Sequence, residues 1–211
     1  LPQGYHFSWL VQLLPFVEQN NGLKHFDFSA GVYEPQNTTA RSVAISIFFC
    51  PSDSSPDKVN GVGASDYAGC HHGVETPIAA DNNGVFFLNS RIRSERIEDG
   101  SSNTIFIGEK ILERGHLGWA SGTRSTLRNM GTQINAGARA NHWSGPATAG
   151  GGVPDVNDPN LVGGFSSWHP GGAQFAFGDG SVRYLSDNVR PEILERLANR
   201  ADGGIVGGDD Y

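Results

Sequence analysis

Long hydrophobic runs and clusters of basic residues are both missing from this sequence, and each absence disfavours a class of function. No stretch of about 18 or more apolar residues occurs, so no segment of the 211 residues is predicted to span a bilayer. Lysine and arginine number 15 against 22 aspartates and glutamates, which leaves a net charge of −7. Because binding to phosphates requires clustered positive charge, nucleic-acid binding is disfavoured.

Complete catalytic motifs are also missing. The sequence contains no G-x-x-x-x-G-K-[ST] phosphate loop, no strand-linked G-x-G-x-x-G, no H-E-x-x-H and no C-x-x-C pair. The segment Gly118-Trp119-Ala120-Ser121-Gly122 places its serine one position too late for a G-x-S-x-G nucleophile elbow. These absences predict a protein that is not an enzyme.

Glycine, in contrast, is abundant. The 29 glycines are about 14% of the chain, roughly twice the usual frequency of ~7%. Such a composition favours strands with irregular connections over a helical bundle. We therefore expect an α+β fold with a mainly antiparallel sheet, a few short helices and long loops near 53–84 and 123–162, arranged as a single domain over 1–211.

The two cysteines, Cys50 and Cys70, allow one disulfide. Neither belongs to a C-x-x-C pair, which argues against thiol redox chemistry and against a cysteine zinc site. We expect a disulfide in an exported chain, and two free buried thiols are the alternative.

The segment Phe165 to Leu185 predicts a hairpin. Asp179-Gly180 lies between two short apolar runs, as in a two-residue hairpin turn. Closing the turn there would pair Phe177 with Val182 and Phe175 with Tyr184. One face would then carry three aromatic side chains, those of Phe175, Phe177 and Tyr184.

Three polar residues around this hairpin allow two interpretations. His169 and Asp179 with Glu109 could form a hydrolase site, although the sequence shows neither a further group nor a pocket. In the structural interpretation, which we favour, His169 hydrogen-bonds to backbone and Asp179 adopts the turn conformation beside Gly180. Glu109 would then be a buried carboxylate that accepts amide hydrogens or pairs with an arginine.

Two helices are predicted. Ser8 to Asn20 has Ser8 as a candidate N-cap, with Pro15 kinking the helix or starting a second turn. Its predicted inward residues are Trp9, Leu13, Phe16 and Val17. Pro191 to Asn199 carries a proline at the first helical position, and its predicted inward residues are Ile193, Leu194 and Leu197.

Candidate ligand-binding residues are scattered, and no cofactor is expected. Calcium is the one ion that we consider, because it accepts carboxylate and carbonyl oxygens from loops. Its candidate ligands are Asp155, Asn157, Asp158 and Asn160, and also Asp81, Asn82 and Asn83. Neither group matches an EF-hand, and solvated polar loops are the simpler interpretation. Trp119, Trp143 and Trp168 could offer stacking faces to a surface glycan, although core packing is commoner for tryptophan.

Five motifs, taken in order, resemble a large bacterial family of prepilin-like proteins that carry a domain of unknown function. Four of them are Ser8-Trp9 with Leu13-Leu14-Pro15 and Glu18-Gln19; Phe49-Cys50-Pro51-Ser52-Asp53; Asp99-Gly100-Ser101-Ser102-Asn103-Thr104-Ile105 with Glu109; and Arg196-Leu197-Ala198-Asn199-Arg200-Ala201-Asp202-Gly203. In the fifth, His169, nine intervening residues and Asp179-Gly180 match the family's H-x9-D-G signature. The resemblance covers nearly the whole chain.

The resemblance implies the architecture of a type IV pilin or a type II secretion pseudopilin. Members begin with a prepilin peptidase site and a long hydrophobic helix, which leads into an α+β head. The chain begins at Leu1-Pro2-Gln3-Gly4 and does not contain that helix, so the resemblance leads us to expect that it corresponds to the head. The resemblance offers no catalytic residues to carry over.

We therefore expect the non-enzymatic head of an exported, cell-surface, periplasmic or extracellular protein with a structural or assembly role. An N-terminal helix in the full-length protein would anchor it. Other pilin-like subunits or secretion-system components would be its partners. A surface glycan- or ligand-binding module is the alternative function, and a hydrolase is the second alternative.

Overall fold

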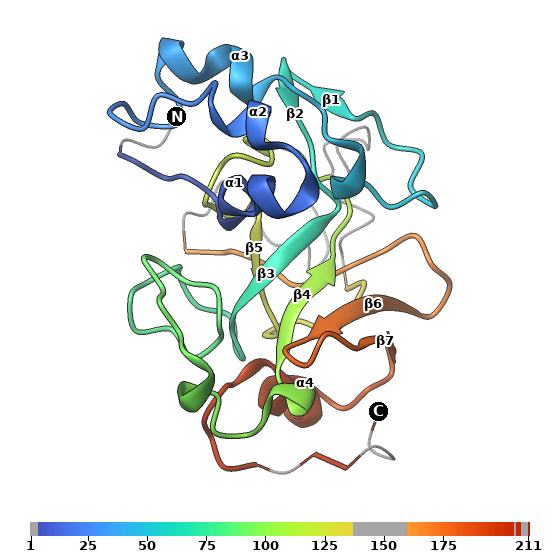
Figure 1. Ribbon diagram of the computed structural model, residues 1–211. Helices are drawn as coiled ribbons and strands as arrows, with labels where there is room; N and C mark the ends of the chain where they lie inside the picture. The colour runs from blue at the N-terminus through green and yellow to red at the C-terminus, as the bar shows by residue number, and fades with distance from the viewer. Residues whose placement is uncertain (1–3, 137–159, 205, 208–210) are drawn as a thin grey trace. The chain divides into compact units, whose positions relative to one another are not determined.

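The computed structural model (Figure 1) describes residues 4–136, 160–204, 206–207 and 211. The chain divides into two compact units. The first unit comprises Leu1–Asp66 with His116–Thr126, and the second comprises Tyr67–Gly115 with Leu127–Tyr211. The single domain expected over 1–211 stays a prediction, because compactness alone does not decide whether the units fold independently.

The second unit is built on a five-stranded sheet in the order β5-β3-β4-β6-β7 (Figure 1). Its strands are β3 (Tyr67–His72), β4 (Ile105–Glu109), β5 (Leu127–Asn129), β6 (Gly172–Phe177) and β7 (Val182–Ser186). Strands β3 and β5 are parallel, whereas β3–β4, β4–β6 and β6–β7 are antiparallel. The expected α+β fold with a mainly antiparallel sheet is confirmed.

Helix α4 (Pro191–Ala198) contributes to the core of the second unit. Pro191 stands at the first turn, where its missing N–H costs nothing, and the predicted inward residues Ile193, Leu194 and Leu197 are all buried. They belong to the same apolar cluster as Phe175 of β6. The prediction for this helix is confirmed.

Gly108 in β4 shows why a strand interior here requires glycine. A Cβ on Gly108 would lie 2.6 Å from the ring of Phe165 and equally close to the ring of Phe175. These two rings pack edge to face, with their centroids 5.2 Å apart. The glycine therefore makes room for the aromatic pair at the centre of the core.

The hairpin forms where it was predicted, but the predicted register is wrong by one residue. Phe175 pairs with Arg183 and Ala176 with Val182. Phe177 donates its amide hydrogen to the carbonyl of Ser181 at 2.9 Å, so the closed turn has three residues, and the last of them, Gly180, has a φ of +85°. Such a loop places a left-handed residue before the second strand. Because one residue of slip moves every β7 side chain to the other face, Tyr184 is exposed and Leu185 is buried beside Phe175.

The first unit is made mainly of single helical turns. Its elements are α1 (Trp9–Leu13), η1 (Leu14–Val17), α2 (Asn20–Leu23), η2 (Pro35–Asn37), α3 (Thr38–Arg41), η3 (Ser46–Phe48), β1 (Lys58–Val59) and β2 (Val62–Gly63). The second unit adds η4 (Ser94–Arg96) and η5 (Ser101–Asn103). Within the described residues, no helix is long and apolar enough to cross a membrane.

The first predicted helix is broken after one turn. Ser8 caps α1 as predicted, its hydroxyl accepting the amide hydrogen of Leu10 at 3.0 Å. Pro15 then belongs to the 3-10 turn η1. Leu10, Val11 and Leu14 are buried, and the predicted inward residues Trp9 and Leu13 are partly buried against the same apolar cluster. In the 3-10 turn, whose rotation per residue differs from that of an α-helix, Phe16 is 83% exposed. The predicted inward face is therefore confirmed in part and is wrong at Phe16.

The two predicted long loops contain strands. Within 53–84 lie β3 and the small β1–β2 hairpin, whose turn residues Asn60 and Gly61 both have positive φ. Within 123–162 lies β5, whereas residues 137–159 lie outside the described residues. Short strands without alternation leave little pattern to recognise in a sequence.

Candidate functional site

Glu109 and His169 come together at the base of the hairpin. Glu109 ends β4 and is 4% exposed, and its Oε1 lies 3.2 Å from His169 Nε2. Its Oε2 accepts the amide hydrogen of Gln174 in β6 at 2.7 Å. The predicted buried carboxylate that accepts an amide hydrogen is thus present. His169 pairs with this carboxylate, and its predicted hydrogen bond to backbone stays a prediction.

The segment leading to His169 is held by further backbone contacts. Ser167 Oγ accepts the amide hydrogen of His169 at 3.0 Å and donates to the carbonyl of Gly172 at 2.6 Å. Tyr184 donates its hydroxyl hydrogen to the carbonyl of Pro170. The loop before β6 is therefore connected at several points to strands β4, β6 and β7.

Asp179 does not join Glu109 and His169. It lies in the turn beyond the far end of β6, and about 10 Å of strand separates Gln174 from that end at Phe177. Its Oδ1 accepts from the amide and hydroxyl of Ser181, at 2.9 and 2.7 Å, and these bonds lower its pKa. Its Oδ2 lies 3.7 Å from Arg183. The three-residue hydrolase constellation is not assembled.

The predicted disulfide between Cys50 and Cys70 is not formed, and both side chains are present as thiols. Cys70 lies in the middle of β3 with no exposed surface, and its Sγ contacts the carbonyl of His72 at 3.8 Å. Burial raises the pKa of Cys70 to about 12. A thiol enclosed in an apolar core and kept protonated behaves as a small hydrophobic side chain.

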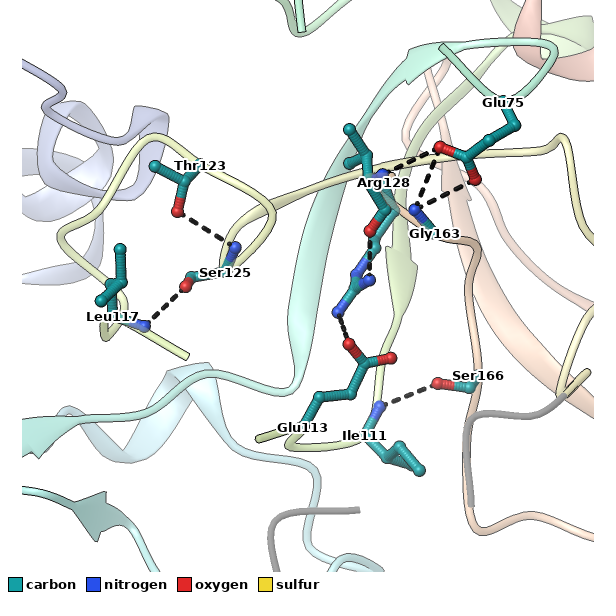
Figure 2. Close-up of polar contacts among 10 residues, drawn as sticks. Glu75, Ile111, Glu113, Leu117, Thr123, Ser125, Arg128, Gly163 and Ser166 are labelled. Atoms are coloured by element: carbon teal, nitrogen blue, oxygen red, sulfur yellow. Dashed lines mark hydrogen bonds and ion pairs between the residues drawn. The ribbon is translucent and has the colours of Figure 1, made fainter. Parts of the chain in front are cut away.

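A buried ion pair lies beside β5 in the second unit (Figure 2). The Nη2 of Arg128 donates to Glu113 Oε2 at 2.7 Å, and its Nη1 donates to the carbonyl of Val162 at 2.6 Å. Arg128 is 2% exposed. No motif indicated this pair, because the two residues are 15 positions apart and lie in segments of different structure.

Glu75 extends this network through the backbone of residues 162–163 (Figure 2). Its carboxylate accepts the amide hydrogens of Val162 at 2.9 Å and Gly163 at 3.1 Å. It also accepts an amide hydrogen of the Asn129 side chain at 2.9 Å. The amide of Val162 therefore donates to Glu75, and the carbonyl of Val162 accepts from Arg128. Charged side chains here form the hydrogen bonds to backbone groups that a neighbouring strand would otherwise form.

His71 extends the network with one defined tautomer. Its Nδ1 lies 3.1 Å from Asn82 Oδ1, which can only accept, so Nδ1 carries the hydrogen. Its Nε2 faces the side-chain amide of Asn129 at 3.4 Å. Burial lowers the pKa of His71 to about 4. Asn82, a calcium candidate, is engaged here as a structural residue.

The C-terminal motif contacts the Asp99 motif. The carboxylate of Asp99 accepts the amide hydrogens of Asp202 and Gly203, each at 2.8 Å. Arg200 donates to the carbonyls of Asn82 and Gly84 at 2.7 and 2.6 Å. Two segments about 100 residues apart are thus joined by hydrogen bonds to backbone groups.

The other candidate ligand residues are dispersed. Trp119 is 1% exposed and packs against Phe26 and Phe48, so it is a core residue of the first unit. Trp168 is 37% exposed. Trp143 and the calcium candidates Asp155, Asn157 and Asp158 lie outside the described residues. Within either unit taken alone, the described residues bring no three ligand atoms of His, Cys, Asp or Glu together.

The fold and these contacts define an α+β protein whose motif residues hold strands and loops together. A family model described as a protein of unknown function (DUF1559) matches residues 2–192. The chain therefore belongs to the DUF1559 family. No curated protein and no solved structure matches it.

Proposed function

We propose that the chain is the non-enzymatic head of an exported, pilin-like or pseudopilin-like protein with a structural or assembly role. The observation that carries the proposal is the contact of Glu109 with His169 and with the Gln174 amide, at 3.2 and 2.7 Å. These residues belong to the motifs that resemble prepilin-like proteins, including the H-x9-D-G spacing. Their use as a latch at the base of a hairpin supports a role in architecture.

The same use of motif residues recurs elsewhere in the second unit. Asp99 accepts backbone amides, and Asp179 stabilises its own turn through Ser181. A catalytic carboxylate would instead face a pocket that admits substrate. Membership of the DUF1559 family is consistent with the proposal, and the partners would be further pilin-like subunits or secretion-system components.

Expression of the complete gene product tests the proposal. Cells would be fractionated, and the membrane and extracellular fractions examined by immunoblotting and negative-stain electron microscopy. We expect membrane association or filaments, mediated by an N-terminal helix. A full-length protein that remains soluble and monomeric in the cytoplasmic fraction contradicts the proposal.

A surface glycan-binding module is the second candidate, favoured by one observation. Trp168 directly precedes the latch residue His169 and keeps 37% of its surface exposed, as a stacking platform requires. A glycan array probed with the wild type and with Trp168→Ala tests this. Binding that is lost in the variant supports the module, and an array without signal removes it.

A further inference from the structure

The first unit contains a pocket of about 130 Å³. Its lining residues come from α2 and the residues that flank it, from α3 and the segment that follows it, and from Trp119. They are Gln19, Gly22, His25, Thr39, Ala40, Val43, Ile45 and Trp119. All of them lie within the first unit, so the pocket belongs to that unit alone.

The apolar wall of the pocket is held in place. Trp119 donates its indole hydrogen to the carbonyl of Val43 at 2.8 Å. Its ring packs edge to face on Phe26, with centroids 5.7 Å apart, and also contacts Phe48 at 5.5 Å. A wall fixed in this way does not have to be ordered by a ligand, which lowers the free-energy cost of binding.

The volume defines the size of the ligand. An apolar cavity of about 150 Å³ in another protein holds one benzene molecule. A pocket of about 130 Å³ is therefore of the size that holds a single six-membered ring.

The rim defines the ligand's polarity. Gln19, His25 and Thr39 are exposed, and their side chains make no hydrogen bond within the described part of the chain. They can therefore bind one polar substituent at the mouth of the pocket. No aspartate, glutamate, lysine or arginine lines the pocket, so its charge matches a neutral ligand.

A sugar ring does not fit this chemistry. A pyranose carries hydroxyl groups around its whole edge, and an apolar wall would leave most of them without hydrogen-bond partners. Each buried hydroxyl without a partner costs about 1–3 kcal/mol. An aromatic ring with one hydroxyl group satisfies both the wall and the rim.

We propose that this pocket is a binding site for a small neutral phenol-like molecule, one six-membered apolar ring with a single hydroxyl group. The ring lies against Trp119, Ala40 and Ile45. The hydroxyl group hydrogen-bonds to the rim side chains. This site is independent of the latch residues in the second unit.

Titration of the ¹⁵N-labelled chain with phenol tests the site by NMR. We expect the indole N–H signal of Trp119 to shift on binding, with a Kd on the order of 1 mM for a ligand of this size. Methyl glucoside serves as the sugar probe and should produce no shift. The absence of a phenol-induced shift overturns the proposal, and an equal response to methyl glucoside overturns the ligand class.

Two substitutions that fill the pocket locate the site. A Cβ at Gly22 would meet only ordinary contacts, Leu14 Cδ1 at 3.9 Å and Gln19 Cβ at 4.0 Å, so the Cβ of Gly22→Leu fits without strain. Thr39→Leu fills the pocket from α3. Each should weaken phenol binding at least about tenfold.

Each filling variant has a matched control on the same helix. Asn21→Leu on α2 and Thr38→Leu on α3 add a leucine at exposed positions that do not line the pocket. These controls should keep the Kd within about twofold of the wild type. Should one filling variant fail to fold, as judged by its NMR dispersion, the other carries the test. Undiminished binding in a folded filling variant contradicts the proposed site.

Discussion

In both units the backbone N–H and C=O groups must find hydrogen-bond partners, and the two units provide those partners in different ways. The second unit uses strand ladders and completes them with charged side chains such as Glu109, Arg128 and Glu75. The first unit has helices of one turn, and its backbone groups are satisfied by neutral side chains as well as by Arg41 and Asp66. Its buried Asn37 donates to the carbonyls of Asp27 and Gly31, both at 3.0 Å, and accepts the amide hydrogen of Asp27 at 2.8 Å.

This difference between the units predicts which substitutions should lower the stability of each unit most. A buried charge that loses its partner cannot be hydrated, whereas a core of aromatic rings loses mainly packing contacts. The second unit should therefore be sensitive to the removal of single charged groups and to pH. The first unit should be sensitive to side-chain volume.

The largest effect is expected for Arg128→Met. The change leaves the Glu113 carboxylate and the Val162 carbonyl without the guanidinium in a buried environment, which should lower the free energy of unfolding by about 3–5 kcal/mol. Urea denaturation followed by circular dichroism measures this. The exposed Arg91→Met is the matched control and should stay within about 0.5 kcal/mol of the wild type. An equal effect in both variants would show that Arg128 contributes no more than a surface charge.

Leu14→Ala should destabilise the first unit by about 2–5 kcal/mol, because Leu14 is fully buried. Phe16→Ala, two positions later, removes a larger side chain but should cost less than about 0.5 kcal/mol, because Phe16 is 83% exposed. Thermal unfolding of both variants measures the contrast. A larger loss of stability in Phe16→Ala than in Leu14→Ala would support the helical face predicted from the sequence and would contradict the 3-10 turn.

The pH dependence should reside in the second unit through His71. Its pKa falls from 6.5 to about 4 in the folded protein, so the unfolded chain takes up a proton first as the pH falls. The stabilisation is complete above pH 6.5 and is lost as the pH falls toward 4. At ~1.4 kcal/mol per pH unit, about 2 kcal/mol is lost between pH 7 and pH 5. His71→Gln should remove this part of the pH dependence in urea denaturation at the two pH values, and an unchanged difference would contradict the assignment.

The smallest effect is expected at the latch. Glu109→Leu leaves the Gln174 amide without an acceptor and should cost roughly 1–3 kcal/mol. Glu109→Gln keeps an oxygen in place and should cost about half as much. Hydrogen exchange of the Gln174 amide measures the local effect directly. Slow exchange retained in Glu109→Leu would show that another group holds this amide.

Local features of the fold could be read from the sequence, but their partners could not. Ser8 as a cap, Pro191 at a first helical turn and Asp179-Gly180 in a turn each act through neighbours within four residues. The hairpin register was missed because a two-residue and a three-residue connection share the same Asp-Gly pair. That one residue exchanges Tyr184 for Leu185 on the buried face.

For the candidate site, the sequence identified the motif residues but predicted only some of their contacts. The sequence predicted a buried Glu109 that accepts an amide hydrogen, but its pairing with His169 joins residues 60 positions apart. The Arg128–Glu113 pair and Glu75 belong to no sequence motif, so the sequence did not predict them. The disulfide expectation failed because cysteine counting carries no information on the burial of Cys70 within β3.

The sequence by itself determined the α+β class, the absence of membrane-spanning runs among these residues, the capped helix starts, the position of the turn and the resemblance to a family. These depend on composition and on short-range sterics and hydrogen bonding. Only the tertiary structure decided the strand register, the inward face around Pro15 and the partners of Glu109, Arg128 and His71. Those contacts form between segments that the chain brings together only when the apolar surfaces of the sheet and of α4 are buried.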